Sequence, residues 1–270
     1  MTAGVGLLTL SDAVSKYLME RDPIGQVICL RQAAAFVFLV PYALATGGRG
    51  VLRAVNYRGQ MLRAAIFVAG VVLVLLSLHR LPLAFVTVAL FSSPLFVALL
   101  SAPVLRERVG MHQWIAIAAG FVGIYLVVQP PGGAFSWIVL LPVLCAAVNA
   151  TRDVVTRLLS RTESSLSMLF WSGLLTLLAG LTTLPFGWHA VGFDGALWYL
   201  AAGLTNAGAH FLVIEAFRLG NAAVVAPFRY SGLLWAMLLG FVVWGDVPTA
   251  TMLAGAAIVV GAGIYMLRKR

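Results

Sequence analysis

Charged residues are scarce in this sequence. Asp, Glu, Lys and Arg make up 10% of the 270 residues, whereas 61% of the residues are hydrophobic. A typical soluble domain has about 25% charged residues, so the composition excludes a soluble globular protein and places most of the chain in lipid. A spanning helix needs roughly 20 apolar residues, so a chain of this length has room for about ten spans.

The sequence also lacks the alternation of polar and apolar residues that transmembrane β-barrels require. The runs FVAGVVLVLLS at 67–77 and LAGAAIVVGAGIYML at 253–267 are apolar on every face. Such runs are typical of spanning helices and not of barrel strands. We therefore predict an all-α membrane protein.

Motifs for catalysis and for cofactor binding are missing too. The chain has no GxxxxGK[ST] loop, no HExxH, no GxSxG and no paired catalytic aspartates, and its four histidines are scattered. Its two cysteines, Cys29 and Cys145, stand in apolar runs, which predicts buried thiols rather than a disulfide framework or a metal cluster. We expect no enzyme, no cofactor and no metal site.

The net charge of +9 does not indicate a nucleic-acid partner, because the basic residues stand in short loops between apolar runs. No basic region precedes an apolar stretch at the start of the chain, so we expect no signal peptide. Glycine, proline and charge clusters divide the chain into ten predicted spans. These spans are 2–19, 24–46, 61–78, 83–105, 111–129, 137–159, 166–186, 196–217, 222–244 and 249–267.

The distribution of Lys and Arg predicts the orientation. The even-numbered loops and the C-terminal tail carry twelve basic residues, whereas the odd-numbered loops carry two, Arg21 and Arg80. Under the positive-inside rule, both termini are expected in the cytoplasm of a bacterial cell, with the chain crossing the inner membrane an even number of times.

Three segments recur in the same order at an offset near 140 residues. DAVSKYL at 12–18 matches DVVTRLL at 153–159, RLPLAFVTVALFSSPLF from Arg80 matches RLGNAAVVAPFRYSGLL from Arg218, and the closing spans also match. Apolar helices resemble one another by composition, but three ordered matches favour a true repeat. An odd number of spans per half inverts the second repeat, as in secondary transporters that work by alternating access. We predict one repeat at 1–133 and the other at 134–270, around a central cavity.

These segments resemble the EamA type of the drug/metabolite transporter superfamily over essentially the whole chain. The resemblance rests on LRERVGMHQWIAIAAGFVGIYLVV, on VVWGDVPTATMLAGAAIVVGAGIYML, and on SDAVSKYL followed by DPIGQVICLRQ. Its marks are the acids Glu107 and Asp246 and the glycine-rich fifth and tenth spans; Arg106 departs from the usual glycine. The resemblance implies a cavity formed mainly by spans 1, 3, 4, 6, 8 and 9. It also implies a small organic substrate, and the sequence looks most like the bacterial amino-acid and aromatic-solute exporters.

Ionisable side chains inside spans are candidate functional residues, because insertion costs about 2.5–3.5 kcal/mol each. Acidic and basic residues four apart share a helix face in the first span and again in the sixth. We predict an outer gate of Asp12 and Lys16 with His79 or Arg80, and an inner gate of Asp153 and Arg157 with Glu215 or Arg218. Alternatively, the long basic side chains reach the headgroups and only fix topology.

A second polar set has apolar or small counterparts in the first half, and a site for an asymmetric solute requires such asymmetry. Its members are Asn149, Arg152, Asn206, His210, Arg229 and Tyr230. A guanidinium suits a carboxylate, because its fork donates two parallel hydrogen bonds, although Arg152 has the alternative of pairing with Asp153 or Glu215. Phe91 and Trp235 are expected to contact the body of the solute.

Together these features predict a secondary transporter that exports a small metabolite, such as an amino acid with an aromatic or other apolar side chain. The alternative is an uptake carrier for riboflavin, S-adenosylmethionine or a nucleotide-like solute; a channel is the rival from another class. Asp12, Asp153 and His210 are candidates for carrying a proton, but facilitated diffusion needs none. The expected partners are the solute and the bilayer, and the protein is a monomer or a weak homodimer.

Overall fold

The described part of the chain is helical throughout. The computed structural model describes residues 1–93, 95–97, 99–100, 111–128, 137–159, 162–219 and 231–268. Its helices are α1 (Thr2–Leu18), α2 (Ile24–Gly47), η1 (Arg49–Leu52), α3 (Tyr57–Arg80), α4 (Leu83–Leu90), α6 (Met111–Val128), η2 (Trp137–Leu140), α7 (Leu141–Leu159), α8 (Ser165–Leu181), η3 (Leu184–Phe186), α9 (Phe193–Leu219), α11 (Ser231–Trp244) and α12 (Ala250–Arg268). The predicted repeat boundary at 133 and 134 falls outside these residues.

Several helices are long and apolar enough to cross a membrane. By length and composition, three qualify in the described ranges: Ile24–Thr46, Tyr57–Arg80 and Trp137–Leu159. Shorter apolar helices include Ser165–Leu181 and Ser231–Trp244. Together with the apolar composition, they give a helical, multi-pass membrane protein, as predicted.

Local sequence explains where the helices begin. The side chain of Asn56 accepts a hydrogen bond of 3.0 Å from the Gly59 amide at the start of α3, and Ser164 accepts one of 3.0 Å from the Ser167 amide before α8. Such caps satisfy amides that have no partner within the helix. Pro23 and Pro82 directly precede α2 and α4, where a missing amide hydrogen costs nothing.

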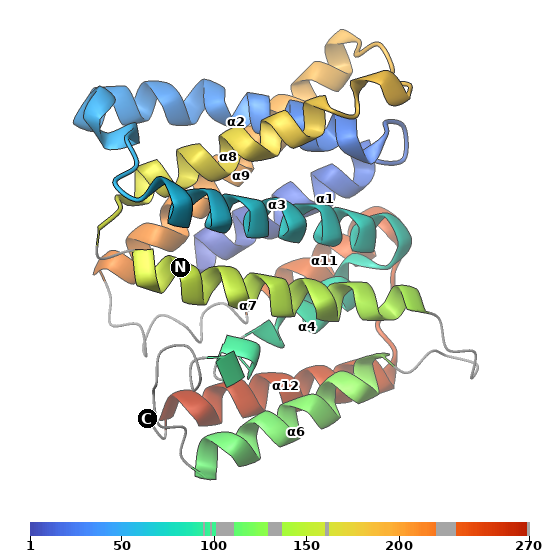
Figure 1. The fold of residues 1–270 in the computed structure, drawn as a ribbon. Helices are drawn as coiled ribbons and strands as arrows, with labels where there is room; N and C mark the ends of the chain where they lie inside the picture. The colour runs from blue at the N-terminus through green and yellow to red at the C-terminus, as the bar shows by residue number, and fades with distance from the viewer. Residues whose placement is uncertain are drawn as a thin grey trace.

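The packing partners of the helices interchange between the two halves. Helix α1 packs on α9, and α7 packs on α3; α2 also contacts α9, and α8 also contacts α3. Three further pairs, α2 with α8, α4 with α11, and α6 with α12, join one helix from each half. Helices α6 and α12 lie together on one side of the bundle (Figure 1).

Close helix contacts depend on glycine. A Cβ atom on Gly203 of α9 would lie 2.5 Å from Ala34 Cβ and 2.6 Å from the Ala35 backbone nitrogen of α2. On Gly180 of α8 it would lie 2.8 Å from the Cys29 backbone nitrogen of α2. Helix α2 is therefore held against both neighbours at a distance that side chains would not allow.

The glycine-rich fifth and tenth predicted spans, now α6 and α12, also meet through small residues. A Cβ on Gly123 would lie 2.9 Å from the carbonyl oxygen of Gly255, whereas a Cβ on Gly261 would have no neighbouring atom within 4 Å. Gly123 therefore allows α6 to approach the backbone of α12 closely.

The connections divide between the two ends of the bundle. The start of α1 and the end of α12 lie at the same end as η1 and the α7–α8 turn (Figure 1). The α1–α2 turn and the α8–α9 connection lie at the opposite end. We call the first the Glu163 end and the second the Asp22 end, after acidic residues in their turns.

Candidate functional site

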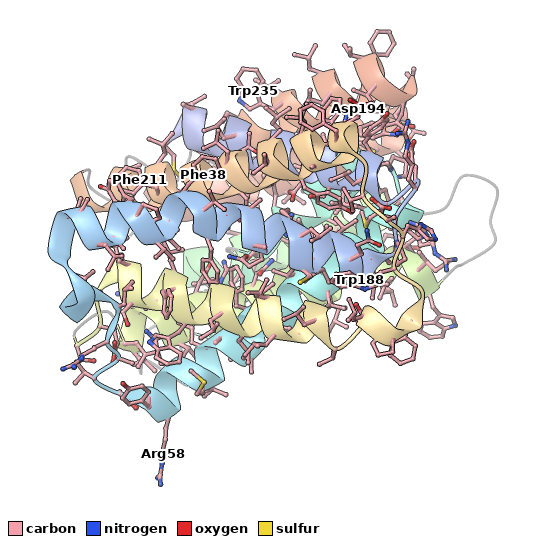
Figure 2. The ribbon with its side chains drawn as sticks, turned by 90° about the horizontal axis from the view of Figure 1, so that it is seen from above. Phe38, Arg58, Trp188, Asp194, Phe211 and Trp235 are labelled. Carbon is pink, nitrogen blue, oxygen red and sulfur yellow. The ribbon has the colours of Figure 1, made fainter. Side chains whose placement is uncertain are left out.

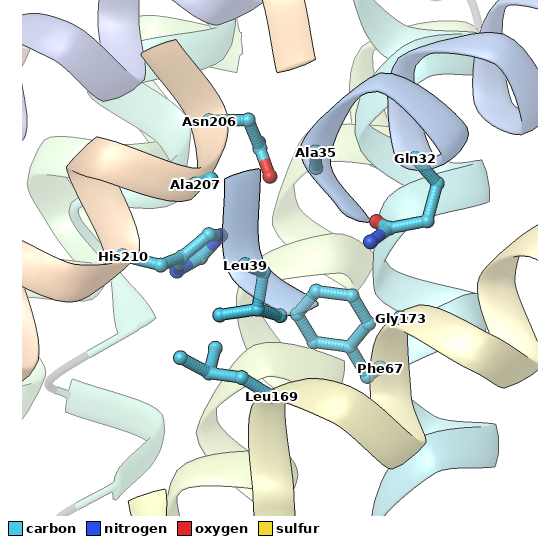
Figure 3. A pocket seen from close by; sticks show the side chains of 9 residues that line it. All are labelled: Gln32, Ala35, Leu39, Phe67, Leu169, Gly173, Asn206, Ala207 and His210. Carbon is cyan, nitrogen blue, oxygen red and sulfur yellow. The ribbon is translucent and has the colours of Figure 1, made fainter. Parts of the chain in front are cut away.

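A pocket lies between α2, α3, α8 and α9 (Figure 3). Its lining residues are Gln32, Ala35, Leu39, Phe67, Leu169, Gly173, Asn206, Ala207 and His210. The cavity volume of about 30 Å³ has room for about two water molecules. The four helices therefore leave little space between them at this place.

Helical spacing brings these side chains together. Gln32, Ala35 and Leu39 are three and four residues apart and share one face of α2. Asn206 and His210 are one turn apart on α9. Figure 3 shows the amide groups of Gln32 and Asn206 reaching into the pocket from different helices, with the Phe67 ring beside them.

Aromatic and cationic groups border the pocket. The Phe67 ring centroid lies 6.1 Å from that of His210, and the Arg152 guanidinium carbon lies 5.7 Å from the same Phe67 ring. Arg152 also binds Asp153 Oδ1 through Nε at 3.1 Å and Nη2 at 2.8 Å. Arg152 therefore pairs with Asp153, which was the alternative to solute binding in the sequence analysis, and it also contacts the lining residue Phe67.

The predicted solute-binding residues divide into three groups. Asn206 and His210 line the pocket. Asn149 of α7 lies against Gly70 of α3, and its Nδ2 donates to Cys145 Sγ at 3.5 Å. Phe91 lies near Gly232 of α11. Trp235 is 39% exposed and covers Gly6 of α1 near the edge of the bundle (Figure 2). Arg229 and Tyr230 lie outside the described residues.

The pocket is lined by two of the six spans that the resemblance implies for the central cavity. Parts of predicted spans 4 and 9 lie outside the described residues, so the full set of cavity helices stays a prediction. Helices α3 and α9 correspond to predicted spans 3 and 8 and line the pocket as expected. Helices α2 and α8 correspond to spans 2 and 7, which were not expected to line it, yet they supply five of the nine lining residues.

The outer-gate residues do not gather around one another. Lys16 Nζ donates a 2.7 Å hydrogen bond to the Leu81 carbonyl and lies 5.3 Å from the Trp244 ring. His79 and Arg80 are exposed at the end of α3. Asp12 instead faces Arg31 of α2 at 3.9 Å.

The inner-gate residues are described only in part. Asp153 binds Arg152, whereas Arg157 is exposed. The side chains of Glu215 and Arg218 lie outside the described parts of α9. Asp153 and Arg157 share a face of α7, as Asp12 and Lys16 share a face of α1, and their role as gates stays a prediction.

Asp12 and Arg31 form a charged pair inside the bundle. Arg31 is 6% exposed, and its Nη1 donates to Ser15 Oγ at 3.0 Å. The side chain of Asp12 is 21% exposed, although Val5 and Met19, seven residues to either side on the same helix face, are buried. The 3.9 Å contact of Asp12 with Arg31 is looser than the 2.8 Å Arg152–Asp153 pair.

Arg63 of α3 is a second buried arginine, and it binds residues of the second half. Its Nε donates to Thr156 Oγ1 at 2.7 Å, and its Nη1 donates to Ser172 Oγ at 2.7 Å and to the Met168 carbonyl at 3.0 Å. The spacing that relates Asp12 to Asp153 also relates Ser15 to Thr156. A buried guanidinium thus binds this hydroxyl in both halves, supplied by α2 in one and by α3 in the other.

Sequence reasoning missed Gln32, Phe67 and Arg31, and it counted Arg63 only as a topology signal. The two arginines had a usable signal, since the insertion cost that singled out Asp12 applies equally to a guanidinium within a predicted span. Gln32 and Phe67 had none, because neither residue type is unusual in a spanning helix.

Contacts at the Asp22 end cross between the halves. Tyr199 Oη of α9 donates to Asp22 Oδ2 at 2.6 Å, and His189 Nδ1 lies 3.7 Å from Asp22 Oδ1. Gln26 binds the His189 backbone twice, donating to its carbonyl at 2.9 Å and accepting from its amide at 2.9 Å. The α1–α2 turn is thereby fastened to the α8–α9 connection.

Contacts at the Glu163 end cross in the opposite sense. Glu163 Oε1 accepts hydrogen bonds from the backbone amides of Val55 at 2.8 Å and Asn56 at 2.6 Å. Ser167 Oγ donates to the Arg53 carbonyl at 3.2 Å, and Trp171 Nε1 to the Leu52 carbonyl at 3.0 Å. The α7–α8 turn is thereby fastened to the α2–α3 connection.

Comparison with known proteins finds the EamA-like transporter family at residues 4–129 and again at 136–268. A riboflavin transporter from Vibrio cholerae is 31% identical, over 96% of this chain and 88% of its own length. An S-adenosylmethionine uptake transporter from Rickettsia felis is 27% identical, over 98% of this chain and 92% of its own length. A protein of known crystal structure shares the fold with a TM-score of 0.69 at 18% identity, over 98% of this chain and 94% of that one.

Proposed function

The chain belongs to the EamA-like transporter family, and from that premise we propose that it carries a small organic solute across the bacterial inner membrane by alternating access. The observation that carries the proposal is the place of the pocket, between α2 and α3 of one half and α8 and α9 of the other. A solute held there contacts both halves, so relative movement of the halves would expose it first to one side and then to the other.

Two inverted five-helix repeats, residues 1–133 and 134–270, are the architecture we propose. The interchange of packing partners supports it, since α1 on α9 becomes α7 on α3 when each helix is replaced by its counterpart. The double match to one family supports it as well. In such repeats the solute site lies near the pseudo-twofold axis. The lining of the pocket by two counterpart pairs, α2 with α8 and α3 with α9, supports that position.

We propose that both termini are cytoplasmic. The start of α1 and the end of α12 lie at the same end of the bundle (Figure 1), which fits an even number of spans. Arg58 projects from the bundle at this end (Figure 2), as expected of a cytoplasmic basic residue. The Glu163 end is then cytoplasmic, and the Asp22 end faces outward.

The solute that the geometry favours has a charged head and an apolar body, as an amino acid with an aromatic or aliphatic side chain does. Phe67, Leu39 and Leu169 offer apolar surface in the pocket. Asp12 and Arg31 offer both charges to an α-amino-acid head group, because Arg31 lies one turn before Ala35 on α2 and its pair with Asp12 is loose. Arg152 is the second candidate for a carboxylate, next to Phe67.

Riboflavin is the second candidate solute, and the 31% identical relative favours it. A flat, uncharged heterocycle would stack on Phe67 and bind the amides of Gln32 and Asn206. S-adenosylmethionine combines both chemistries, because it carries a heterocycle and an α-amino-acid head group; the Rickettsia relative favours uptake as the direction of transport, against the export that we predict from the sequence.

Competition in proteoliposomes tests these assignments. Proteoliposomes that contain the purified protein are loaded with unlabelled phenylalanine, riboflavin or S-adenosylmethionine, and entry of the same solute in labelled form is measured. Unlabelled amino acids, riboflavin, S-adenosylmethionine and nucleotides are then added outside as competitors. Saturable counterflow of one solute supports the carrier. Stepwise single-channel currents in a planar bilayer, without counterflow, would contradict it. Repeating the assay with and without a pH gradient separates proton coupling from facilitated diffusion, and inverted vesicles give the direction.

A further inference from the structure

We propose that the carboxylates of Asp22 and Glu163 are latches that hold the two ends of the carrier shut, so that removing either one favours the state open at that end. This proposal rests on the alternating access proposed above. It concerns residues outside the pocket that contribute nothing to its lining.

A latch must join parts that separate. The charged pairs inside the bundle do not meet this condition, because Asp12 and Arg31 both belong to the first half, and Arg152 and Asp153 are neighbours on α7. Breaking either pair leaves the contact between halves in place. Asp22 and Glu163 differ, because each one binds a segment of the other half.

Both latch carboxylates are shielded from water. The side chain of Asp22 is 14% exposed, and Glu163 is 7% exposed. Hydrogen bonds to ionised groups are stronger than those between neutral groups, and burial increases the cost of leaving such a group without a partner. Separation of either end therefore requires the carboxylate to find water or another donor.

The two latches occupy corresponding places in the halves. The spacing that relates Asp12 to Asp153 also relates Asp22 to Glu163. It relates Gln26, which binds the His189 backbone, to Ser167, which binds the Arg53 carbonyl. The acidic residue in the first turn of each half therefore contacts the other half near its second connection: Glu163 binds the amides of Val55 and Asn56 before α3, and Asp22 binds Tyr199 in α9 and lies 3.7 Å from His189 in the α8–α9 connection. The two contacts lie at opposite ends of the bundle.

Both latches are closed at once in this structure, where the pocket has room for about two water molecules. A carrier in this state opens toward one side when one latch breaks and the other holds. Because a two-state equilibrium shifts by the free-energy difference between its states, weakening one latch shifts the balance toward opening at that end alone.

Chemical labelling of the pocket tests the proposal without any need to know the solute. Cys29 and Cys145 are replaced by alanine, and Ala207 of the pocket lining is replaced by cysteine as a reporter. A membrane-impermeant maleimide is then added to right-side-out or inside-out vesicles. We expect Asp22→Ala to raise the labelling rate about tenfold from the outside, and Glu163→Ala to raise it about tenfold from the inside.

Graded variants and matched controls separate a latch from general loosening. Asp22→Asn keeps an acceptor without the charge and should give a smaller rise, and Tyr199→Phe should resemble Asp22→Ala because it removes the donor. Asp194→Asn is the control at the Asp22 end, because Asp194 is exposed at the start of α9. Arg58→Gln is the control at the Glu163 end. Neither control should change the rate.

The outcomes are distinct for the two proposals. The latch proposal is wrong if Asp22→Ala and Glu163→Ala raise the labelling rate from the same side. It is also wrong if both variants elute as folded protein in gel filtration and neither is labelled faster than its control. Solute counterflow by the unaltered protein decides the carrier proposal independently. If Asp22→Ala raises the labelling rate from the inside and Glu163→Ala raises it from the outside, the latch proposal is upheld and the predicted orientation is reversed.

Discussion

Replacement of Gly203 by alanine should destabilise the protein by overpacking α9 against α2. The added Cβ would lie 2.5 Å from Ala34 Cβ, 2.6 Å from the Ala35 nitrogen and 2.7 Å from the Ala34 carbonyl carbon. Two of these atoms belong to the backbone, so no side-chain rotation relieves the contact. The helices must separate by about 1 Å to restore normal carbon contacts of about 3.5–4.0 Å.

The expected cost of Gly203→Ala is about 1–3 kcal/mol, the usual range for overpacking of a well-packed interior. Part of it comes from the dispersion contacts that neighbouring side chains of α2 and α9 lose, since a gap of 0.5–1 Å forfeits about a quarter to a half of each contact. Thermal unfolding in detergent, followed by gel filtration of the soluble fraction, measures this loss as a lower midpoint temperature.

Gly261→Ala is the matched control, because a Cβ at this helical position meets nothing within 4 Å. Alanine has the higher helix propensity, so the midpoint should stay the same or rise slightly. Equal midpoints for the Gly203 and Gly261 variants would refute the reasoning, because they would mean that α2 and α9 are not held at the observed distance.

Three other variants or tags give sharp outcomes. Arg63→Lys should lower the thermal midpoint, because an ammonium group cannot reach Thr156, Ser172 and the Met168 carbonyl in the fork geometry of a guanidinium; an unchanged midpoint would contradict this. Phe67→Ala should raise the KM of counterflow about tenfold with folding retained, since it removes the ring that contacts His210 and Arg152, and a change in maximal rate alone would argue against a solute contact. A protease-cleavable tag after Arg270 should be cut in inside-out vesicles and protected in right-side-out ones, and the reverse result would overturn the predicted orientation.

The sequence was sufficient for the fold class because the signal for lipid burial is strong and repeated. Long apolar runs predict the helices, and the prolines before them predict where two of them begin. The second predicted span begins at 24, where α2 begins, and the fourth at 83, where α4 begins. The family resemblance, stated on the motifs of the first, fifth and tenth spans, is confirmed by the double match to the EamA-like family.

The candidate site was harder to predict, because helix periodicity gives a face but not its neighbour. Asp12 and Lys16 do share a face of α1, yet Asp12 turns to Arg31 while Lys16 reaches the Leu81 carbonyl. Asn206 and His210 stood out as polar residues within an apolar helix and do line the pocket. Gln32 was not singled out, since a lone amide in a span carries little signal without its partners across the bundle.

In the other half, the partners of Glu163 are main-chain amides, and the hydrogen-bond partner of Asp22 is the side chain of Tyr199. Any residue except proline supplies an amide hydrogen, so residues 55 and 56 are free to change identity in evolution while the contact with Glu163 persists. The hydroxyl of Tyr199 disappears with a single substitution to phenylalanine. A side-chain substitution other than one to proline can therefore remove the hydrogen bonds of Glu163 to the other half only at Glu163 itself, whereas the Asp22–Tyr199 bond can be lost at either of its two residues.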